Sequence, residues 1–209
     1  GAIPGLPLST PQAIGIQFLL FEALVVGLTT YYGLPRSAAA AGTVAVAVAA
    51  VGSVAMLYIG AATRQLDLPE IHRRLLFGSS VEVLFGVLGF VAAVTYLLTG
   101  AGPTPLESLI GRPSPAPVTF VALLILWDLT YRIGTSWWSA VVALWRAVHV
   151  DLSPETTSRI RRLDAENIAF SAIQLALVPF LLEEPVLLGA VVGHVLAVAI
   201  VCTIAIALT

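Results

Sequence analysis

Lysine is missing from the 209-residue chain, and cysteine occurs once, at Cys202. Without a lysine amine the chain cannot form a Schiff base with retinal, pyridoxal phosphate or a carbonyl substrate, and it has no phosphate-loop lysine. A single cysteine excludes an internal disulfide, a dithiol redox pair and an iron–sulfur cluster held only by thiolates of this chain. The ten basic residues are all arginines.

Charge is scarce as well: 11% of the residues are charged and 58% are hydrophobic, with a mean hydropathy of +0.98. Soluble domains are typically ~45–50% apolar and ~25% charged. The net charge of −2 excludes the basic surface of a nucleic-acid-binding protein, so we expect no nucleic-acid partner. The composition predicts an all-α polytopic membrane protein with membrane lipids around it.

Six apolar runs approach the length of about 20 residues that a spanning helix needs. They cover residues 13–32, 38–62, 77–98, 118–145, 168–182 and 185–208, and the fifth is the shortest. We predict one integral membrane domain over residues 1–209, a bundle of about six transmembrane helices in tandem hairpins. The parts outside the helices are an N-terminal segment (1–12) without a signal-peptide pattern, two arginine-rich connections (63–76 and 146–167) and a loop on the other side (99–117).

Arginine is unevenly distributed between the two sides of this predicted bundle. Short loops rich in Lys and Arg stay cytoplasmic. The connections 63–76 and 146–167 hold seven arginines, whereas only Arg36 and Arg112 lie on the other side. The asymmetry predicts a multi-pass protein of the cell (cytoplasmic) membrane with both termini in the cytoplasm. An interfacial belt is expected at Trp137, Trp138, Trp145 and Arg146.

The two arginine-rich connections share a pattern of Arg, Asp-Leu, Pro-Glu and Arg-Arg-Leu, within residues 64–75 and 146–163. Pro69 and Pro154 suit the first turn of a helix, and the glutamate that follows each proline suits its positive end. Both segments are therefore predicted to begin helices that run into the membrane. We interpret the shared pattern as an internal repeat; the alternative is that amphipathic helix starts converge on such residues.

Four charged residues lie inside predicted spans, where each costs about 2.5–3.5 kcal/mol on insertion scales. Asp128 and Arg132 are four positions apart, so they share a helix face and can pair. That pair is either a gate or an orienting ion pair. Glu22 and Glu82 have no basic residue three or four positions away, and each is expected to be protonated or to reach Arg132 across the bundle.

The fifth predicted helix carries a polar stripe of Asp164, Asn167, Ser171 and Gln174, which either lines a path or bonds to neighbouring helices. His194 lies midway along the sixth and is interpreted first as a core histidine, then as a proton relay or a metal or haem ligand. No two histidines share a helix at a spacing of three or four, so we expect no metal site and no cofactor.

Small residues at helical spacing predict close helix packing. This applies to the second predicted helix, at Gly42, Gly52 and Gly60, and to the sixth, at Gly189 and Gly193. A solvated acidic turn is expected at residues 183–185.

The leading hypothesis is a channel or transporter for an ion, a proton or a small solute, rather than an enzyme. Its expected polar centre consists of Glu22, Glu82, Asp128, Arg132, Asn167, Gln174 and His194. One alternative is a non-catalytic membrane subunit or scaffold, and another is a membrane-embedded enzyme acting on a lipid or quinone. Lipid or partner contacts are expected from Arg73, Arg74, Arg161 and Arg162, and the partner would be a membrane protein or a second copy of the chain.

Overall fold

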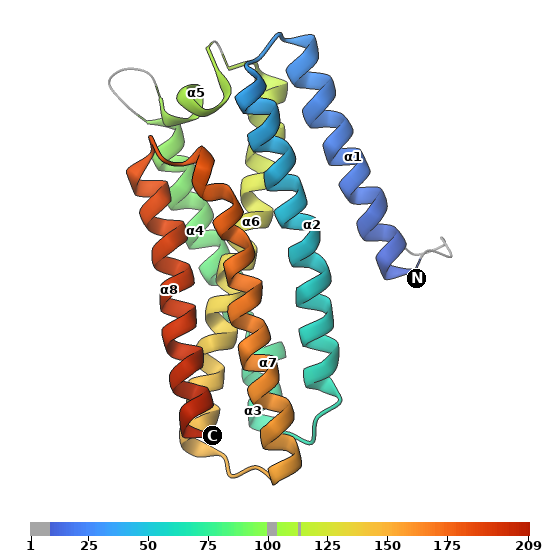
Figure 1. The fold of residues 1–209 in the computed structure, drawn as a ribbon, viewed down its shortest axis with the longest axis vertical. Coiled ribbons are helices and arrows are strands. Elements are labelled where there is room, and N and C mark those ends of the chain that lie inside the picture. The colour runs from blue at the N-terminus through green and yellow to red at the C-terminus, as the bar shows by residue number, and fades with distance from the viewer. Residues whose placement is uncertain (1–8, 100–103, 113) are drawn as a thin grey trace.

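The computed structural model describes residues 9–99, 104–112 and 114–209, and within these ranges it contains helices and no strand (Figure 1). The elements in chain order are α1 (Thr10–Tyr31), α2 (Arg36–Arg64), α3 (Glu70–Phe77), α4 (Val81–Leu98), α5 (Pro105–Ile110), α6 (Ala116–His149), α7 (Pro154–Ala172), the 3₁₀ helix η1 (Ile173–Phe180) and α8 (Pro185–Leu208). The fold class predicted from the sequence, an all-helical bundle, is confirmed.

Five segments of the described chain are long and apolar enough to cross a membrane, by length and composition. They are Thr10–Tyr31, Arg36–Arg64, Glu70–Leu98, Ala116–His149 and Pro185–Leu208. Large aliphatic side chains cover their outer faces, as at Leu19, Leu88 and Leu196, which are 66%, 57% and 57% exposed. Such a surface suits lipid rather than water, and together with the five apolar helices it indicates a multi-pass membrane protein.

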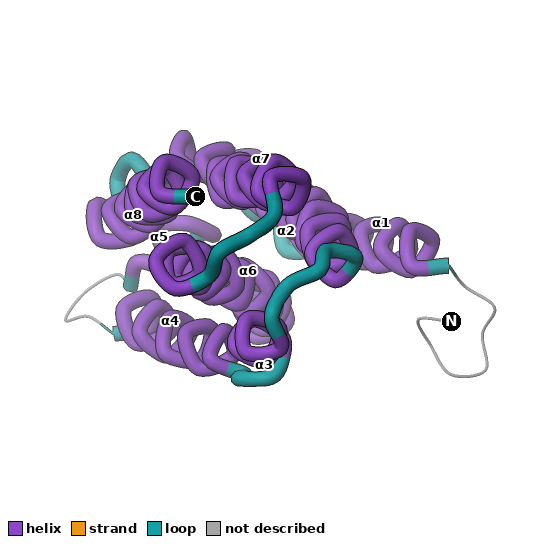
Figure 2. The backbone as a smooth tube through the Cα atoms, turned by 90° about the horizontal axis from the view of Figure 1, so that it is seen from below, coloured by secondary structure: helices purple, strands orange, loops and turns teal. Residues whose placement is uncertain are grey.

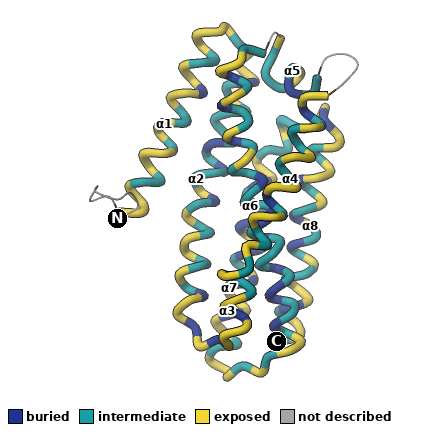
Figure 3. The backbone as a smooth tube through the Cα atoms, turned by 180° about the vertical axis from the view of Figure 1, so that it is seen from behind, coloured by how far each residue is buried: buried dark blue, intermediate teal, exposed yellow. Residues whose placement is uncertain are grey.

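Helix α6 is the centre of the bundle, packed against α4, α8, α2, α7, α1 and α3 (Figure 2). Helix α1 packs mainly on α2 and stands at the edge, where most of its surface is exposed (Figure 3). The C-terminus lies at the same end as α3 and the connection from α6 to α7 (Figure 1). Whether this end faces the cytoplasm, and whether the helices form repeated hairpins, stay predictions.

The third predicted span, residues 77–98, differs from the structure at its start. The apolar helix there is α4, which begins at Val81, while Phe77 ends the separate short helix α3. Ser80 has a φ of 54° and interrupts the α-helical backbone between them. The break gives the chain a short amphipathic helix before α4, which hydropathy alone does not reveal.

The fifth predicted span, residues 168–182, is divided between the end of α7 and the 3₁₀ helix η1. Pro179 lies inside η1, where it has no backbone N–H to continue an α-helical ladder. This stretch is not among the five membrane-length helices, so a sixth crossing stays a prediction.

Helices do begin in both arginine-rich connections, as predicted. In α7 the hydroxyl of Ser153 accepts a hydrogen bond from the backbone N–H of Thr156 at 3.3 Å, and Pro154 is the first helical residue. In α3 the first helical residue is Glu70, with Pro69 just before it. The interpretation as an internal repeat stays a prediction, because α3 stops after 8 residues whereas α7 continues for 19.

Glycines allow close approach at specific helix crossings. A Cβ added to Gly134 of α6 would lie 2.6 Å from the carbonyl oxygen of Glu82 and 2.7 Å from the backbone nitrogen of Gly86, both in α4. The close packing expected on α2 is confirmed at Gly42 and Gly52, where an added Cβ would lie 2.7 Å from Val25 Cγ1 and 2.9 Å from Arg132 Cδ, respectively.

The same expectation for α8 is wrong. A Cβ added to Gly189 or Gly193 would have no described atom within 4 Å. These two glycines face open space, because the residues by which α8 packs lie on another face, at Val191, Val195 and Val198.

Candidate functional site

The interior of the bundle contains polar side chains among its apolar ones. Buried polar side chains gather on α6, α7 and η1: Thr130, Arg132, Ser136, Arg146, Asp164, Asn167, Ser171 and Gln174. The last four form the stripe expected from the sequence, and each is at most 6% exposed. Apolar outer faces around a hydrogen-bonded polar interior are the arrangement that a bilayer favours.

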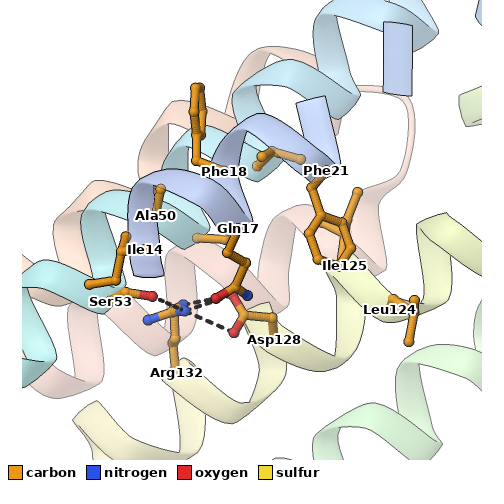
Figure 4. A pocket seen from close by; sticks show the side chains of 12 residues that line it. Ile14, Gln17, Phe18, Phe21, Ala50, Ser53, Leu124, Ile125, Asp128 and Arg132 are labelled. Carbon is orange, nitrogen blue, oxygen red and sulfur yellow. Dashed lines mark hydrogen bonds and ion pairs between the residues drawn. The ribbon is translucent and has the colours of Figure 1, made fainter. Parts of the chain in front are cut away.

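Asp128 and Arg132 form the ion pair that their spacing predicts. Arg132 donates from Nε to Asp128 Oδ2 at 2.9 Å and from Nη2 to both carboxylate oxygens at 2.7–2.8 Å. The same Nη2 donates to Ser53 Oγ of α2 at 2.8 Å (Figure 4). Arg132 is buried beside Gly52, whereas 28% of the Asp128 side chain is exposed, and Arg132 Nη1 has no partner within the described ranges.

A cavity of about 30 Å³ lies beside this pair, between α1, α2 and α6; we call it the ion-pair cavity. Asp128 and Arg132 form part of its wall, and Gln17 of α1 extends toward them (Figure 4). Phe18 and Phe21 of α1 also line it. Its volume accommodates about two water molecules.

The two glutamates inside the predicted spans lie apart from Arg132. Glu22 accepts a hydrogen bond from Thr43 Oγ1 of α2 at 2.7 Å, while its Oε2 is buried and without a partner in the described structure. Glu82 Oε2 is also buried and unpartnered there. Among the residues described, neither glutamate forms an ion pair with Arg132, which is bonded to Asp128 instead.

Glu82 lines a second, larger cavity of about 230 Å³, which we call the Glu82 cavity. Arg64, Thr135, Ser139 and Asn167 also line it, so its wall contains hydroxyl, amide and charged groups. The guanidinium of Arg64 lies 4.2 Å from the centroid of the Phe77 ring. The cavity lies between α2, α4, α6 and α7 near the α3 end of the bundle.

The two cavities follow one another along α2 and α6. On α2 the ion-pair cavity is lined by residues from Val46 to Ser53, and the Glu82 cavity by residues from Met56 to Arg64. On α6 the corresponding residues lie within 124–132 and 131–139. Arg132 and Ser53, which are bonded to each other, line the ion-pair cavity close in sequence to Tyr131 and Met56 of the Glu82 cavity.

His194 and Asn167 meet around Ser136 of α6. His194 Nε2 lies 2.9 Å from Ser136 Oγ, and Asn167 Nδ2 donates to the Ser136 carbonyl oxygen at 3.0 Å. Cys202 Sγ lies 3.5 Å from the same amide nitrogen. No group of three His, Cys, Asp or Glu residues that could hold a metal occurs in the described ranges. These contacts join α6, α7 and α8, and Gln174 lies elsewhere, at a third cavity.

The ion pair that joins two helices within the described ranges was not predicted from the sequence. Arg146 Nη2 of α6 donates to Asp164 Oδ2 of α7, and both side chains are buried. Arg146 was expected in an interfacial belt; that expectation is wrong, because its guanidinium turns inward to Asp164. Burial raises the pKa of Asp164, and the nearby Arg146 opposes this shift. Only the position of Asp164 in the polar stripe signals that it faces inward.

The four arginines expected to contact lipid or a partner lie on the surface. Arg73 donates to the Leu66 carbonyl oxygen at 3.0 Å, and Arg162 pairs with Glu166 at 2.9 Å. All four, Arg73, Arg74, Arg161 and Arg162, are exposed on α3 and α7. Their binding of lipid head groups or of a partner stays a prediction.

The acidic turn at residues 183–185 is only partly solvated, contrary to the expectation. Glu184 is buried and accepts hydrogen bonds from Tyr96 Oη of α4 at 2.8 Å and from Ser108 Oγ of α5 at 2.7 Å. Glu183 beside it is exposed. The start of α8 is thus attached to two other helices by a single carboxylate.

Apolar helices of membrane-spanning length around a buried Arg146–Asp164 pair define a multi-pass membrane protein with polar groups in its interior. Residues 1–205 match the profile of a protein family, and the chain belongs to that family, a family of unknown function (DUF7530). No curated protein matches the sequence, and no solved structure does.

Proposed function

We propose that the protein is a channel or transporter for an ion, a proton or a small solute, with its path along the contact between α2 and α6. One observation carries the proposal: the buried Arg132 and its partner Asp128 line the ion-pair cavity, and the Glu82 cavity is lined by the next residues along the same two helices, α2 and α6. A charged pair inside a membrane-length helix is costly, and such residues mark ion and proton paths.

Acidic groups flank the pair along this path. Glu82 lines the cavity toward α3, and Glu22 is bonded to Thr43, about one helical turn of α2 before the ion-pair cavity begins at Val46. Each glutamate retains a buried carboxylate oxygen without a partner in the described structure, so each has a free site for a proton or a cation. Asn167 adds an amide to the wall of the Glu82 cavity.

Asp128 and Arg132 serve in this proposal as the gate. While the two are bonded, the guanidinium holds α6 to α2 through Ser53, and the path is closed at this contact. The gate opens in this proposal when the transported species takes the place of Arg132 at the Asp128 carboxylate, so the path requires that carboxylate. The ion-pair cavity has room for about two waters, which favours a proton or small ion over a larger solute.

The test is flux through the purified protein in liposomes, with an internal pH dye and then with indicators for Na⁺, K⁺ and Cl⁻ under an imposed potential. Asp128→Asn removes the titratable group of the gate, and Glu82→Gln removes that of the cavity. Asp151→Asn and Glu70→Gln, at exposed positions, are the matched controls. We expect flux to be lost in the first two variants and retained in the controls.

Unchanged flux in both Asp128→Asn and Glu82→Gln contradicts the proposal, as does the absence of flux from folded wild-type protein. His194 and Gln174 lie outside the two cavities of the path. Although both belong to the polar centre expected from the sequence, His194→Ala and Gln174→Leu should leave flux unchanged if the path follows α2 and α6.

A further inference from the structure

A third cavity, of about 350 Å³, lies toward the α5 end of the bundle, and we call it the apolar cavity. Its wall comes from α1, α2, α4, α5, α6, η1 and α8, with aliphatic side chains such as Leu106 and Val121 and small ones such as Ala93. Among the described residues, no charged side chain lines it. A volume of this size falls within the range of small-molecule sites, about 300–1,000 Å³.

Three polar side chains line the apolar cavity: Thr29, Thr130 and Gln174. Both threonine hydroxyls donate to carbonyl oxygens of their own helices, Thr29 to Val25 at 2.7 Å and Thr130 to Leu126 at 3.0 Å. Gln174 is 2% exposed, and its Nε2 has no acceptor within the described ranges. A buried donor without an acceptor is destabilising, so this amide needs an acceptor from elsewhere.

We propose that the apolar cavity binds a neutral lipid that carries a carbonyl group, with the carbonyl oxygen accepting a hydrogen bond from Gln174 Nε2. The uncharged wall disfavours a carboxylate or a phosphate, because a buried charge without a partner is strongly destabilised. The aliphatic wall suits a hydrocarbon chain. The site is distinct from the proposed path, because Gln174 lines neither the ion-pair cavity nor the Glu82 cavity.

Equilibrium binding to the purified full-length chain tests the site with three tritiated probes. Methyl palmitate and a prenylated naphthoquinone both carry a neutral carbonyl, and hexadecane carries none. We expect saturable binding of at least one carbonyl probe, at one molecule per chain. The comparison between the two carbonyl probes distinguishes an acyl ester from a quinone as the natural class.

Gln174→Leu keeps the side-chain size similar and removes the amide. It should weaken binding of the carbonyl probe by about tenfold while leaving hexadecane binding unchanged, because only the hydrogen bond is lost. Gln17→Leu, which removes an amide from the ion-pair cavity, is the matched control and should bind the probe as the wild type does.

Substitution of two adjacent alanines of α4 tests whether the probes bind inside the apolar cavity. Ala93 lines the cavity, whereas Ala92 is exposed on the outer face. Ala93→Phe should abolish binding of all three probes, and Ala92→Phe should not. The proposal is overturned if folded wild-type protein binds neither carbonyl probe saturably, if folded Ala93→Phe binds them normally, or if Gln174→Leu leaves carbonyl-probe affinity unchanged.

Discussion

The guanidinium of Arg146 and the carboxylate of Asp164 join α6 to α7 inside the bundle, with 2% and 7% of their side-chain surface exposed. The two helices follow one another in the chain and are joined by the short segment from Val150 to Ser153. The ion pair therefore fixes the register of α7 against the central helix at the α3 end.

Asp164→Asn should reduce the free energy of unfolding by about 3–5 kcal/mol, because it leaves Arg146 as a buried charge without its counter-ion. Thermal unfolding in detergent, followed by circular dichroism, measures the loss. Asp151→Asn, at an exposed position in the same connection, is the control and should have little effect. The double variant Arg146→Met/Asp164→Leu should recover most of the stability, since no charge remains buried. A stable Asp164→Asn protein would argue against the pair as a stabilising contact.

Gly134→Ala should destabilise the protein by about 1–3 kcal/mol, because the added methyl group meets the α4 backbone at Glu82 and Gly86. Gly193→Ala on α8 meets no described atom and should be neutral or slightly stabilising, since alanine has the higher helix propensity. The comparison is made by the same unfolding measurement. If the two variants had the same free energy of unfolding, the close contact between α4 and α6 would not lie at Gly134.

Glu184→Ala should lower the free energy of unfolding by about 1.5–3 kcal/mol, because two hydroxyl donors lose a charged acceptor. The neighbouring variant Glu183→Ala removes an equal charge from an exposed position and should leave stability unchanged. Denaturation midpoints of both variants and the wild type, measured in the same detergent, give the two losses of stability. If both variants lose the same amount, the effect comes from charge near the turn rather than from the bonds to Tyr96 and Ser108.

Cys202 should react with a maleimide only when the bundle opens, because its side chain is fully buried against Ala140 and Val198. We expect labelling ~10-fold or more slower than at Leu208→Cys in a Cys202→Ala background, since Leu208 is 57% exposed on the same helix. Mass spectrometry of timed samples gives both rates. Rapid labelling of Cys202 in folded protein would contradict the packing of α8 on α6.

Contacts within one helix could be predicted from the sequence, whereas contacts between helices could not. The Asp128–Arg132 pair follows from a spacing of four, which fixes both side chains on one face. The bond from Arg132 to Ser53 depends on how α2 is placed beside α6, and no spacing in the chain specifies that placement. The Arg146–Asp164 pair could not be predicted for the same reason, because it depends on how α7 is placed beside α6. The polar stripe that contains Asp164 did correctly predict that this face of the helix is buried.

Helix boundaries were also predictable only where residues close in the sequence determine them. Pro154 marks the start of α7 through its fixed φ and the capping hydroxyl before it, both local properties. The left-handed backbone of Ser80 has no such local signal, because serine rarely requires positive φ, and the break between α3 and α4 was missed. Glu184 was expected in water for a similar reason, since its partners Tyr96 and Ser108 are far away in the chain.

Helix α6 has a consequence for how the chain is made. It begins at Ala116, after α1, α2 and α4 have been synthesised, yet all three pack against it. During translation these earlier helices have no central partner, and Gly86 of α4 faces no Gly134. Until α6 emerges, α1 and α2 can already pack on each other, whereas α4 lacks its main partner and exposes the surface that α6 later covers.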